Sequence, residues 1–211
     1  MGRNADLPVS GDYNGDGTSD IAVFRPTDGL WAIHGFSRIY WGTESDLPVP
    51  GDYNGDGDCD PAIYRSAYGL WAVRAITRIY FGSGEDQPVP GDYDGVGGKE
   101  IAIFRPASGL WAILDVSRCY FGAGDDIPVP GDYTGDTICR PGIYRPDTGL
   151  WALREETRIY FGNASDIPLS ADFYGLGANQ IGIFRESSGL WAIEGVTRCY
   201  FGGAGDFPVA K

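Results

Sequence analysis

The sequence predicts an all-β protein, a five-bladed β-propeller. The string Gly-Leu-Trp-Ala occurs five times at a constant spacing of 40 residues, beginning at residues 29, 69, 109, 149 and 189. Each unit has four short apolar runs separated by turn residues and no helical period, and four-stranded units of this length, repeated four to eight times, are typical of propeller blades. An open β-solenoid is the alternative, although its coils are usually shorter and need distinct capping units.

The repeats fill nearly the whole chain, so we expect one propeller domain over residues 1–211. The units are residues 6–45, 46–85, 86–125, 126–165 and 166–205. Residues 206–211 begin a sixth copy, which duplicates the segment at 6–10. We expect one of these two segments to complete the seam of the propeller, and the other to be displaced, frayed or docked on a neighbouring molecule.

The first unit shows how the strands are expected to follow one another. Its first strand is predicted at 7–13, its second at 21–25, its third at 30–33 and its fourth at 38–41. In the next three units the first strand contains two prolines, which cannot donate to neighbours on both sides and therefore favour a sheet edge. Residues 26–29, Pro-Thr-Asp-Gly, are typical of a tight turn.

Most aromatic residues recur at five equivalent places in each unit, represented by Tyr13, Phe24, Trp31, Tyr40 and Trp41. Blades pack on both faces, so this regularity predicts that the aromatic residues form the core between neighbouring blades. The alternative interpretation makes the tryptophans of Gly-Leu-Trp platforms that stack on sugars. That candidate ligand set is Trp31, Trp71, Trp111, Trp151 and Trp191.

Charged residues recur as regularly as the aromatic ones. In every unit an aspartate such as Asp6 precedes the first strand, and two arginines such as Arg25 and Arg38 follow the second strand and open the fourth. We expect these repeated ions to pair with one another or with main-chain groups, because arginine rather than lysine at every such place favours planar, bidentate contacts. Ligand binding is the alternative role.

The loop after the first strand has the spacing of a calcium loop. Oxygen-bearing side chains stand at its first, third, fifth and ninth places, with Gly17 at the sixth to permit a sharp turn. A full EF-hand would need a glutamate at the twelfth place, where the chain has Val23, so we expect a loop between two strands. The side chains are Asp12, Asn14, Asp16 and Asp20.

The second loop repeats this set and the later loops depart from it. In the third, Val96 replaces the fifth-place ligand, although Asp92, Asp94 and Glu100 remain. In the fourth, Arg140 puts a cation at the ninth place, where it should oppose Ca²⁺ by repulsion. The fifth retains a single acid, and its persistence predicts that the first aspartate also accepts main-chain N–H groups. We therefore expect two calcium ions, in the loops of Asp12, Asn14, Asp16 and Asp20 and of Asp52, Asn54, Asp56 and Asp60.

Composition excludes several classes of function. A formal charge of −13 with two lysines argues against nucleic-acid binding, and no apolar run approaches the roughly 20 residues of a membrane span. With His34 as the single histidine, histidine-dependent catalysis would rest on one residue in a variable turn. We expect no enzymatic activity.

The four cysteines are interpreted as substitutions into existing positions rather than as a disulfide framework. Cys119 and Cys199 replace an isoleucine, whereas Cys59 and Cys139 share the eighth place of their loops. We expect half-buried thiols. The alternative is one bridge between Cys119 and Cys139, which are half a unit apart.

The string Leu-Pro-Val-Pro-Gly-Asp-Tyr-Asn-Gly-Asp-Gly-x-x-Asp at 47–60, followed by Ala-Ile-Tyr-Arg and Gly-Leu-Trp, resembles the FG-GAP/VCBS-type repeats of bacterial surface and secreted proteins. Such repeats are akin to the calcium-bearing blades of integrin α-subunits. The resemblance implies the eight side-chain ligands named above, a main-chain oxygen from Thr18 or Asp58, and an extracellular or cell-surface location.

Taken together, these features favour a non-enzymatic, calcium-stabilised binding module for glycans or a partner surface, of the lectin or adhesion kind. A structural scaffold that uses the propeller as a docking platform is the alternative. A lectin built from the repeated residues would have five equivalent sites. A protein-binding face would use the variable turns at 34–37, 74–77, 114–117, 154–157 and 194–197.

Overall fold

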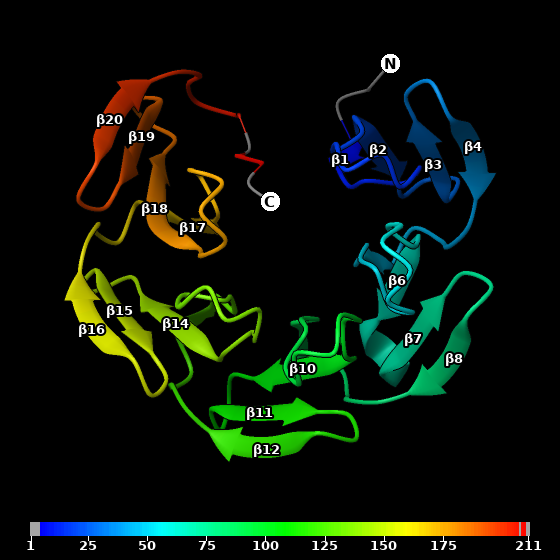
Figure 1. The fold of residues 1–211 in the computed structure, drawn as a ribbon, viewed down its shortest axis with the longest axis horizontal. Helices are drawn as coiled ribbons and strands as arrows, with labels where there is room; N and C mark the ends of the chain where they lie inside the picture. Colours follow the sequence, from blue (N-terminus) through cyan, green and yellow to red (C-terminus); the bar gives the residue numbers. More distant parts are fainter. Residues whose placement is uncertain (1–4, 207, 210–211) are drawn as a thin grey trace. The chain divides into compact units, whose positions relative to one another are not determined.

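The computed structural model describes residues 5–206 and 208–209. It contains five four-stranded antiparallel sheets, each of which uses its strands in chain order (Figure 1). The chain is therefore an all-β, five-bladed β-propeller built from repeats of about 40 residues, as the spacing of Gly-Leu-Trp-Ala predicts. Of the two segments expected at the seam, 6–10 lies within the described residues, whereas residues 207, 210 and 211 of the other lie outside them.

The strands recur at equivalent places in every blade. The first blade has β1 (Leu7–Pro8), β2 (Ala22–Arg25), β3 (Leu30–Ile33) and β4 (Ser37–Tyr40). The second has β5 (Leu47–Pro48), β6 (Ala62–Arg65), β7 (Leu70–Val73) and β8 (Thr77–Tyr80). The third has β9 (Gln87–Pro88), β10 (Ala102–Arg105), β11 (Leu110–Ile113) and β12 (Ser117–Tyr120).

The fourth blade has β13 (Ile127–Pro128), β14 (Gly142–Arg145), β15 (Leu150–Leu153) and β16 (Thr157–Tyr160). The fifth has β17 (Ile167–Ala171), β18 (Gln180–Arg185), β19 (Leu190–Ile193) and β20 (Thr197–Tyr200). One short 3₁₀ turn, η1 (Ser66–Tyr68), follows β6. Among the described residues no helix is long and apolar enough to cross a membrane.

The first strand of the first blade is shorter than predicted. The expectation was a strand over 7–13, but the ladder covers Leu7–Pro8 and resumes only as an isolated bridge between Gly11 and Asp20. Proline has no N–H to donate, and the chain must turn into the loop at Asp12, so continuous pairing stops. The strand does lie at a sheet edge, as the prolines at this place in the repeats indicate.

The chain divides into two compact units, which we describe separately. The first contains the first two blades together with Val96–Ile103 and Ile113–Asp115. Its core is apolar and aromatic, with Phe24 and Trp31 completely buried and in contact at 5.2 Å between ring centroids. Ile63 and Ala72 of the second blade join this cluster, so apolar contacts link the first blade to the second.

The second unit contains Gly91–Gly95, Phe104–Ala112 and the chain from Val116 onward. Its core repeats the same arrangement, with Tyr144 and Trp151 completely buried and their ring centroids 5.2 Å apart. Ile181 and Ile183 of the fifth blade pack against this pair. The inner aromatic places of the repeat are therefore core positions, as predicted.

In four of the blades, the aspartate before the first strand forms an ion pair with the arginine that ends the second strand. Asp46 accepts two hydrogen bonds from Arg65, at 2.6 and 2.9 Å, and a third from the main-chain N–H of Thr43. The aspartate is buried, whereas the arginine is half-exposed. The expected bidentate pairing is present at Asp6–Arg25, Asp46–Arg65, Asp126–Arg145 and Asp166–Arg185.

Candidate functional site

The loop at 12–20 is built on its first aspartate. Burial raises the pKa of the Asp12 carboxyl, but main-chain N–H groups lower it by more, chiefly those of Gly17 at 2.7 Å and Gly15 at 2.8 Å. Gly17 has φ +81°, a conformation that L side chains rarely adopt, so a glycine is required at the sixth place. The tight turn brings the later ligands back toward the first.

The predicted ligands of the first two loops converge in pairs. The amide nitrogen of Asn14 lies 3.3 Å from Asp20, which joins the third and ninth places of the first loop. In the second loop the amide nitrogen of Asn54 lies 2.9 Å from Asp56, which joins the third and fifth places. In both loops the asparagine amide therefore lies beside a carboxylate, and Ca²⁺ takes carboxylate, amide and main-chain oxygens as ligands.

Electrostatics in the second loop also fit a cation. Burial raises the pKa of the Asp60 carboxyl, and the charges of Asp56, Asp52 and Asp58 raise it further, against a lowering by the N–H of Tyr53. Several carboxylates with the same charge therefore repel one another around Asp60. A divalent cation among them would remove that repulsion.

The third loop brings its acids closer than the sequence suggests. In the described part of the chain, one group of three acidic side chains has ligand atoms that all lie within 4.8 Å of one another: Asp92, Asp94 and Glu100. Val96, expected to leave a gap at the fifth place, is 80% exposed. The number of ligands in the sequence favours the first two loops over this one, but spacing along the chain does not give the distances between the ligands.

The fourth and fifth loops keep the turn but not the ligand set. Asp172 accepts N–H groups from Leu176 at 3.0 Å and from Gly177 at 2.7 Å, so the first aspartate does have the structural task that its persistence predicts. In the fourth loop Arg140 forms an ion pair with Asp136 and holds the pKa of that carboxyl well below its usual range.

The tryptophans of Gly-Leu-Trp lie in the core. Trp31, Trp71, Trp111 and Trp151 have no exposed surface, and Trp191 is partly buried. Each indole N–H donates to a main-chain carbonyl ten residues later, for example from Trp151 to Phe161 at 3.0 Å. A fully buried indole offers no face to a sugar, so the four buried tryptophans are unsuited to stacking on one in this structure.

The exposed aromatic residue of the repeat is the tyrosine that ends each outer strand, and here the prediction that it belongs to the core is wrong. The five tyrosines are 70–75% exposed. In the first blade, Leu30 is opposite Tyr40 and Trp31 is opposite Ile39, so the tyrosine points to the face opposite the tryptophan. The set is Tyr40, Tyr80, Tyr120, Tyr160 and Tyr200.

An exposed arginine shares that face two residues before each tyrosine. In the fourth blade Ala152 is opposite Arg158 and Leu150 is opposite Tyr160. These arginines form no hydrogen bond or ion pair with any residue in the described ranges, in contrast to the arginines after the second strand. They are Arg38, Arg78, Arg118, Arg158 and Arg198. The expectation that all ten repeated arginines are structural therefore holds for one set only.

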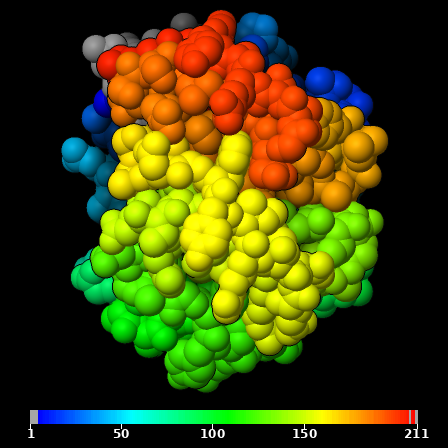
Figure 2. All heavy atoms as spheres, turned by 90° about the vertical axis from the view of Figure 1, so that its left-hand side faces the viewer, coloured from blue at the N-terminus to red at the C-terminus, as the bar shows by residue number. Residues whose placement is uncertain are grey.

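A groove lies over this face of the blade. In the fourth blade a cavity of about 510 Å³ is lined by Ala152, Arg158 and Tyr160, with Tyr120 and Phe121 of the preceding blade. The second blade has an equivalent cavity of about 130 Å³, where Ala72 and Arg78 meet Trp41 of the first blade. The small alanine in the floor leaves space between the arginine and the neighbouring aromatic side chain. Outer strands β16 and β20, which carry this motif, lie at the surface in Figure 2.

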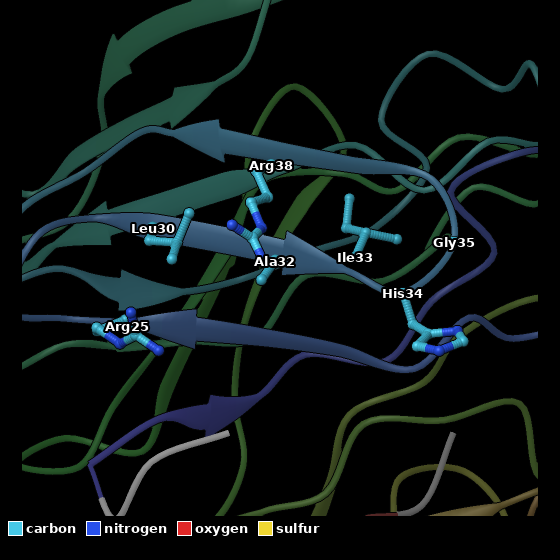
Figure 3. Close-up of a pocket in the computed structure, with 7 residues that line it drawn as sticks. All are labelled: Arg25, Leu30, Ala32, Ile33, His34, Gly35 and Arg38. Atoms are coloured by element: carbon cyan, nitrogen blue, oxygen red, sulfur yellow. The ribbon is translucent and has the colours of Figure 1, made fainter. Parts of the chain in front are cut away.

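Figure 3 shows the same face in the first blade. Arg38 reaches from β4 across β3, with its guanidinium group beside Ala32, and Arg25 comes from β2. The cavity there has a volume of about 440 Å³. His34 lies at the end of β3 in an exposed turn, the ordinary place for a surface histidine.

The four cysteines form no disulfide, so the alternative bridge between Cys119 and Cys139 is absent. Cys119 is half-buried, and burial raises the pKa of its thiol. Thiols with a raised pKa are poor nucleophiles at neutral pH. The Cys119 thiol is therefore a poor nucleophile.

Comparisons with known proteins give a fold relative and no family. A solved structure of an Agrocybe aegerita lectin, described as recognising non-reducing terminal N-acetylglucosamine, aligns with a TM-score of 0.54 at 15% identity. The alignment covers 85% of this chain and 61% of the lectin chain, so this chain spans less than two thirds of the lectin's length. No protein-family model and no curated protein matches, and the resemblance to FG-GAP/VCBS-type repeats therefore rests on the sequence motifs of the repeat alone. The similarity to the lectin is one of fold.

Proposed function

We propose that this protein is a non-enzymatic glycan-binding protein whose sugar sites are the grooves over the outer face of successive blades. The observation that carries the proposal is the repeated Arg-x-Tyr of the outer strand, which is exposed in all five blades and whose arginine has no hydrogen-bond or ion-pair partner within the described part of the chain. Residues that are repeated for folding are expected to be buried or paired. An exposed, unpaired set favours a binding role.

The chemistry of the groove suits a saccharide. Arg158 offers planar N–H donors to hydroxyl or acetamide oxygens, and the Tyr160 ring presents an apolar face to the C–H groups of a pyranose. Ala152 leaves the floor low enough for a ring to enter. The fold shared with a lectin supports the same class of ligand, but the residues named here come from this chain.

Calcium has a structural part in the proposal. In the first and second loops the amide nitrogens of Asn14 and Asn54 face carboxylates, and a rotation of each amide would turn its oxygen toward an ion in their place. We propose that each of these loops binds one Ca²⁺ through its four side chains predicted from the sequence, with a main-chain oxygen from Thr18 in the first loop and from Asp58 in the second. The ions would hold the turn between the first and second strands, away from the grooves.

A glycan array with competition by free N-acetylglucosamine, followed by calorimetry on the best ligand, tests the proposal. Arg158→Ala should lower the number of sugars bound per chain by one and leave the affinity of the other sites unchanged. Arg154→Ala is the matched control, because Arg154 pairs with Glu155 on the surface outside the groove. An array that retains no glycan at millimolar calcium would contradict the lectin and leave the docking scaffold as the better function.

A further inference from the structure

In the fourth loop the positively charged guanidinium group of Arg140 lies against oxygen atoms of the loop itself. The Nη1 group of Arg140 donates to Thr134 Oγ1 at 3.0 Å, to Asp136 Oδ1 at 2.8 Å and to the carbonyl of Ile138 at 3.0 Å. Its Nη2 group adds a bond to the other oxygen of Asp136 at 2.5 Å. A single guanidinium therefore contacts two side chains and one main-chain oxygen of the same loop.

The three acceptors are the oxygens that a metal would use. Thr134, Asp136 and Ile138 occupy the third, fifth and seventh places of the loop, and in loops of this spacing those places supply two side-chain oxygens and one main-chain oxygen to the ion. One nitrogen at hydrogen-bond distance from all three occupies the centre of that set. The sequence predicts only that Arg140 repels calcium, whereas the geometry shows that it satisfies the same oxygens.

A second change, in another part of the blade, accompanies the arginine. Glu156, in the turn between β15 and β16, lies 3.8 Å from Arg140 Nε. Of the five blades, only the one with arginine at the ninth place has an acid here. The equivalent residues of the other blades are Phe36, Ile76, Val116 and Val196. The charge on Arg140 is thus matched from outside the loop as well as from within it.

The fifth loop uses a weaker form of the same arrangement. Gln180, at the ninth place, donates from its amide nitrogen to the seventh-place carbonyl of Ala178 and accepts the N–H of Phe173 at 2.8 Å. The first two loops have Asp20 and Asp60 at the ninth place, and a carboxylate accepts hydrogen bonds rather than donating them. A donor at the ninth place therefore reaches the seventh-place oxygen, and an acid there leaves that oxygen to an ion.

We propose that the Arg140 guanidinium replaces a divalent cation in the fourth loop, and that the ninth residue decides whether a loop is organised by metal or by a side chain. The proposal rests on the calcium loops of the proposed function for its comparison. It makes the fourth blade independent of calcium. It also predicts that the loop becomes a metal site when the arginine is exchanged for an acid.

Conversion of the loop is the direct test. The variant Thr134→Asn, Thr137→Gly, Arg140→Asp restores the ligand pattern of the first loop, and Thr137→Gly also relieves a φ of +71° at the sixth place. Titration of chelator-treated protein with calcium chloride should find one more ion per chain in this variant than in the parent chain. An unchanged number of ions in a folded variant would overturn the proposal.

A second variant separates this proposal from that for the first two loops. Arg140→Ala should lower the Tm by the same amount in calcium and in chelator, because the lost cation is part of the chain, and Arg154→Ala should leave it unchanged. A loss of stability confined to the calcium sample, or no loss at all, would overturn the role of Arg140. A parent chain that binds no calcium would contradict the sites in the first two loops, while the Arg140→Ala comparison still decides the role of the arginine.

Discussion

The main-chain N–H of Cys59 donates to the carbonyl of Asp12 at 2.5 Å, so a hydrogen bond connects the second loop to the first aspartate of the first loop. The same bond joins later loops in pairs, from Lys99 to Asp52 and from Cys139 to Asp92. The eighth-place side chain also packs against the glycine before that aspartate, as Cys59 does at Gly11. A loop that is held in one conformation therefore also restrains the loop of the next blade.

This link makes the calcium proposal testable through stability. Calcium that binds only the folded chain should stabilise it by about 2.7 kcal/mol per site at 100 times the dissociation constant. Asp16→Ala combined with Asp56→Ala should abolish the rise in Tm, because each change removes the fifth-place ligand of one loop. Asp147→Asn, an exposed acid outside the loops, is the control. Equal Tm values for the parent chain in calcium and in chelator would exclude both sites.

Loss of the aspartate and loss of the arginine should lower the unfolding free energy by different amounts. Asp46→Ala leaves Arg65 and the N–H of Thr43 without their acceptor and should cost about 1–3 kcal/mol of unfolding free energy. Arg65→Ala should cost less, because Thr43 still satisfies part of the carboxylate and the arginine is half-exposed. Urea unfolding of both variants gives the order, and a larger loss for Arg65→Ala would contradict it.

The repeat predicts the fold because its signal is redundant. Five copies of Gly-Leu-Trp-Ala at one spacing fix the number of blades, and β3, β7, β11, β15 and β19 all begin at the leucine of that string. The outcome for the aromatic residues differs, because repetition shows that Trp31 and Tyr40 are both needed without showing which face each occupies. The alternation of Arg38, Ile39 and Tyr40 contains that information, since a period of two places the arginine and tyrosine together.

The loops show a second reason why the sequence alone does not predict the whole site. Ligand spacing identifies the turn and the role of Asp12, but the distances among Asp92, Asp94 and Glu100 depend on how the turn closes. The Arg140 contacts depend in addition on the seventh-place carbonyl, which every residue type supplies equally. Main-chain ligands cannot be recognised from residue types, so the replacement of an ion by a side chain can be identified only from the three-dimensional structure.

The glycine of Gly-Leu-Trp should be irreplaceable for a steric reason. Gly149 has φ +65°, and a Cβ there would collide with the main-chain carbonyl of Gly162. Gly35 has a similar φ of +76° with no atom within 4 Å of the added Cβ. Gly35→Ala should cost about 1 kcal/mol from φ alone, whereas Gly149→Ala should cost clearly more because backbone must move. Equal losses in thermal or urea unfolding would show that the close approach is unimportant.

Asp172 should contribute stability that depends on pH. Main-chain N–H groups, first that of Gly177 and then that of Leu176, lower the pKa of its carboxyl in the folded chain. A depressed folded pKa gives stability that is fully present above the unfolded pKa of about 3.9 and is lost as pH falls through the folded pKa. The Tm difference between the parent chain and Asp172→Asn should therefore be constant from pH 7 to about pH 5 and shrink below pH 4. A difference that does not change in acid would remove this role.

Filling the groove tests the sugar site without removing a polar group. Ala152 is buried in the floor of the fourth-blade cavity, beside Arg158 and Tyr160. Ala152→Leu adds three carbon atoms that occupy the space a pyranose ring would need, while both exposed side chains remain. The number of sugars bound per chain should fall by one, and the Tm should stay near that of the parent chain because apolar volume enters an open cavity.

Ala164→Leu, in an exposed turn of the same blade, carries the same change in volume and should bind the full number. The comparison with Arg158→Ala then identifies the type of site. If removal of the arginine and filling of the floor each eliminate one sugar, both act on the same groove. A loss with Arg158→Ala but none with Ala152→Leu would place the sugar on the outer strand alone, where Arg158 and Tyr160 are reached without entering the cavity.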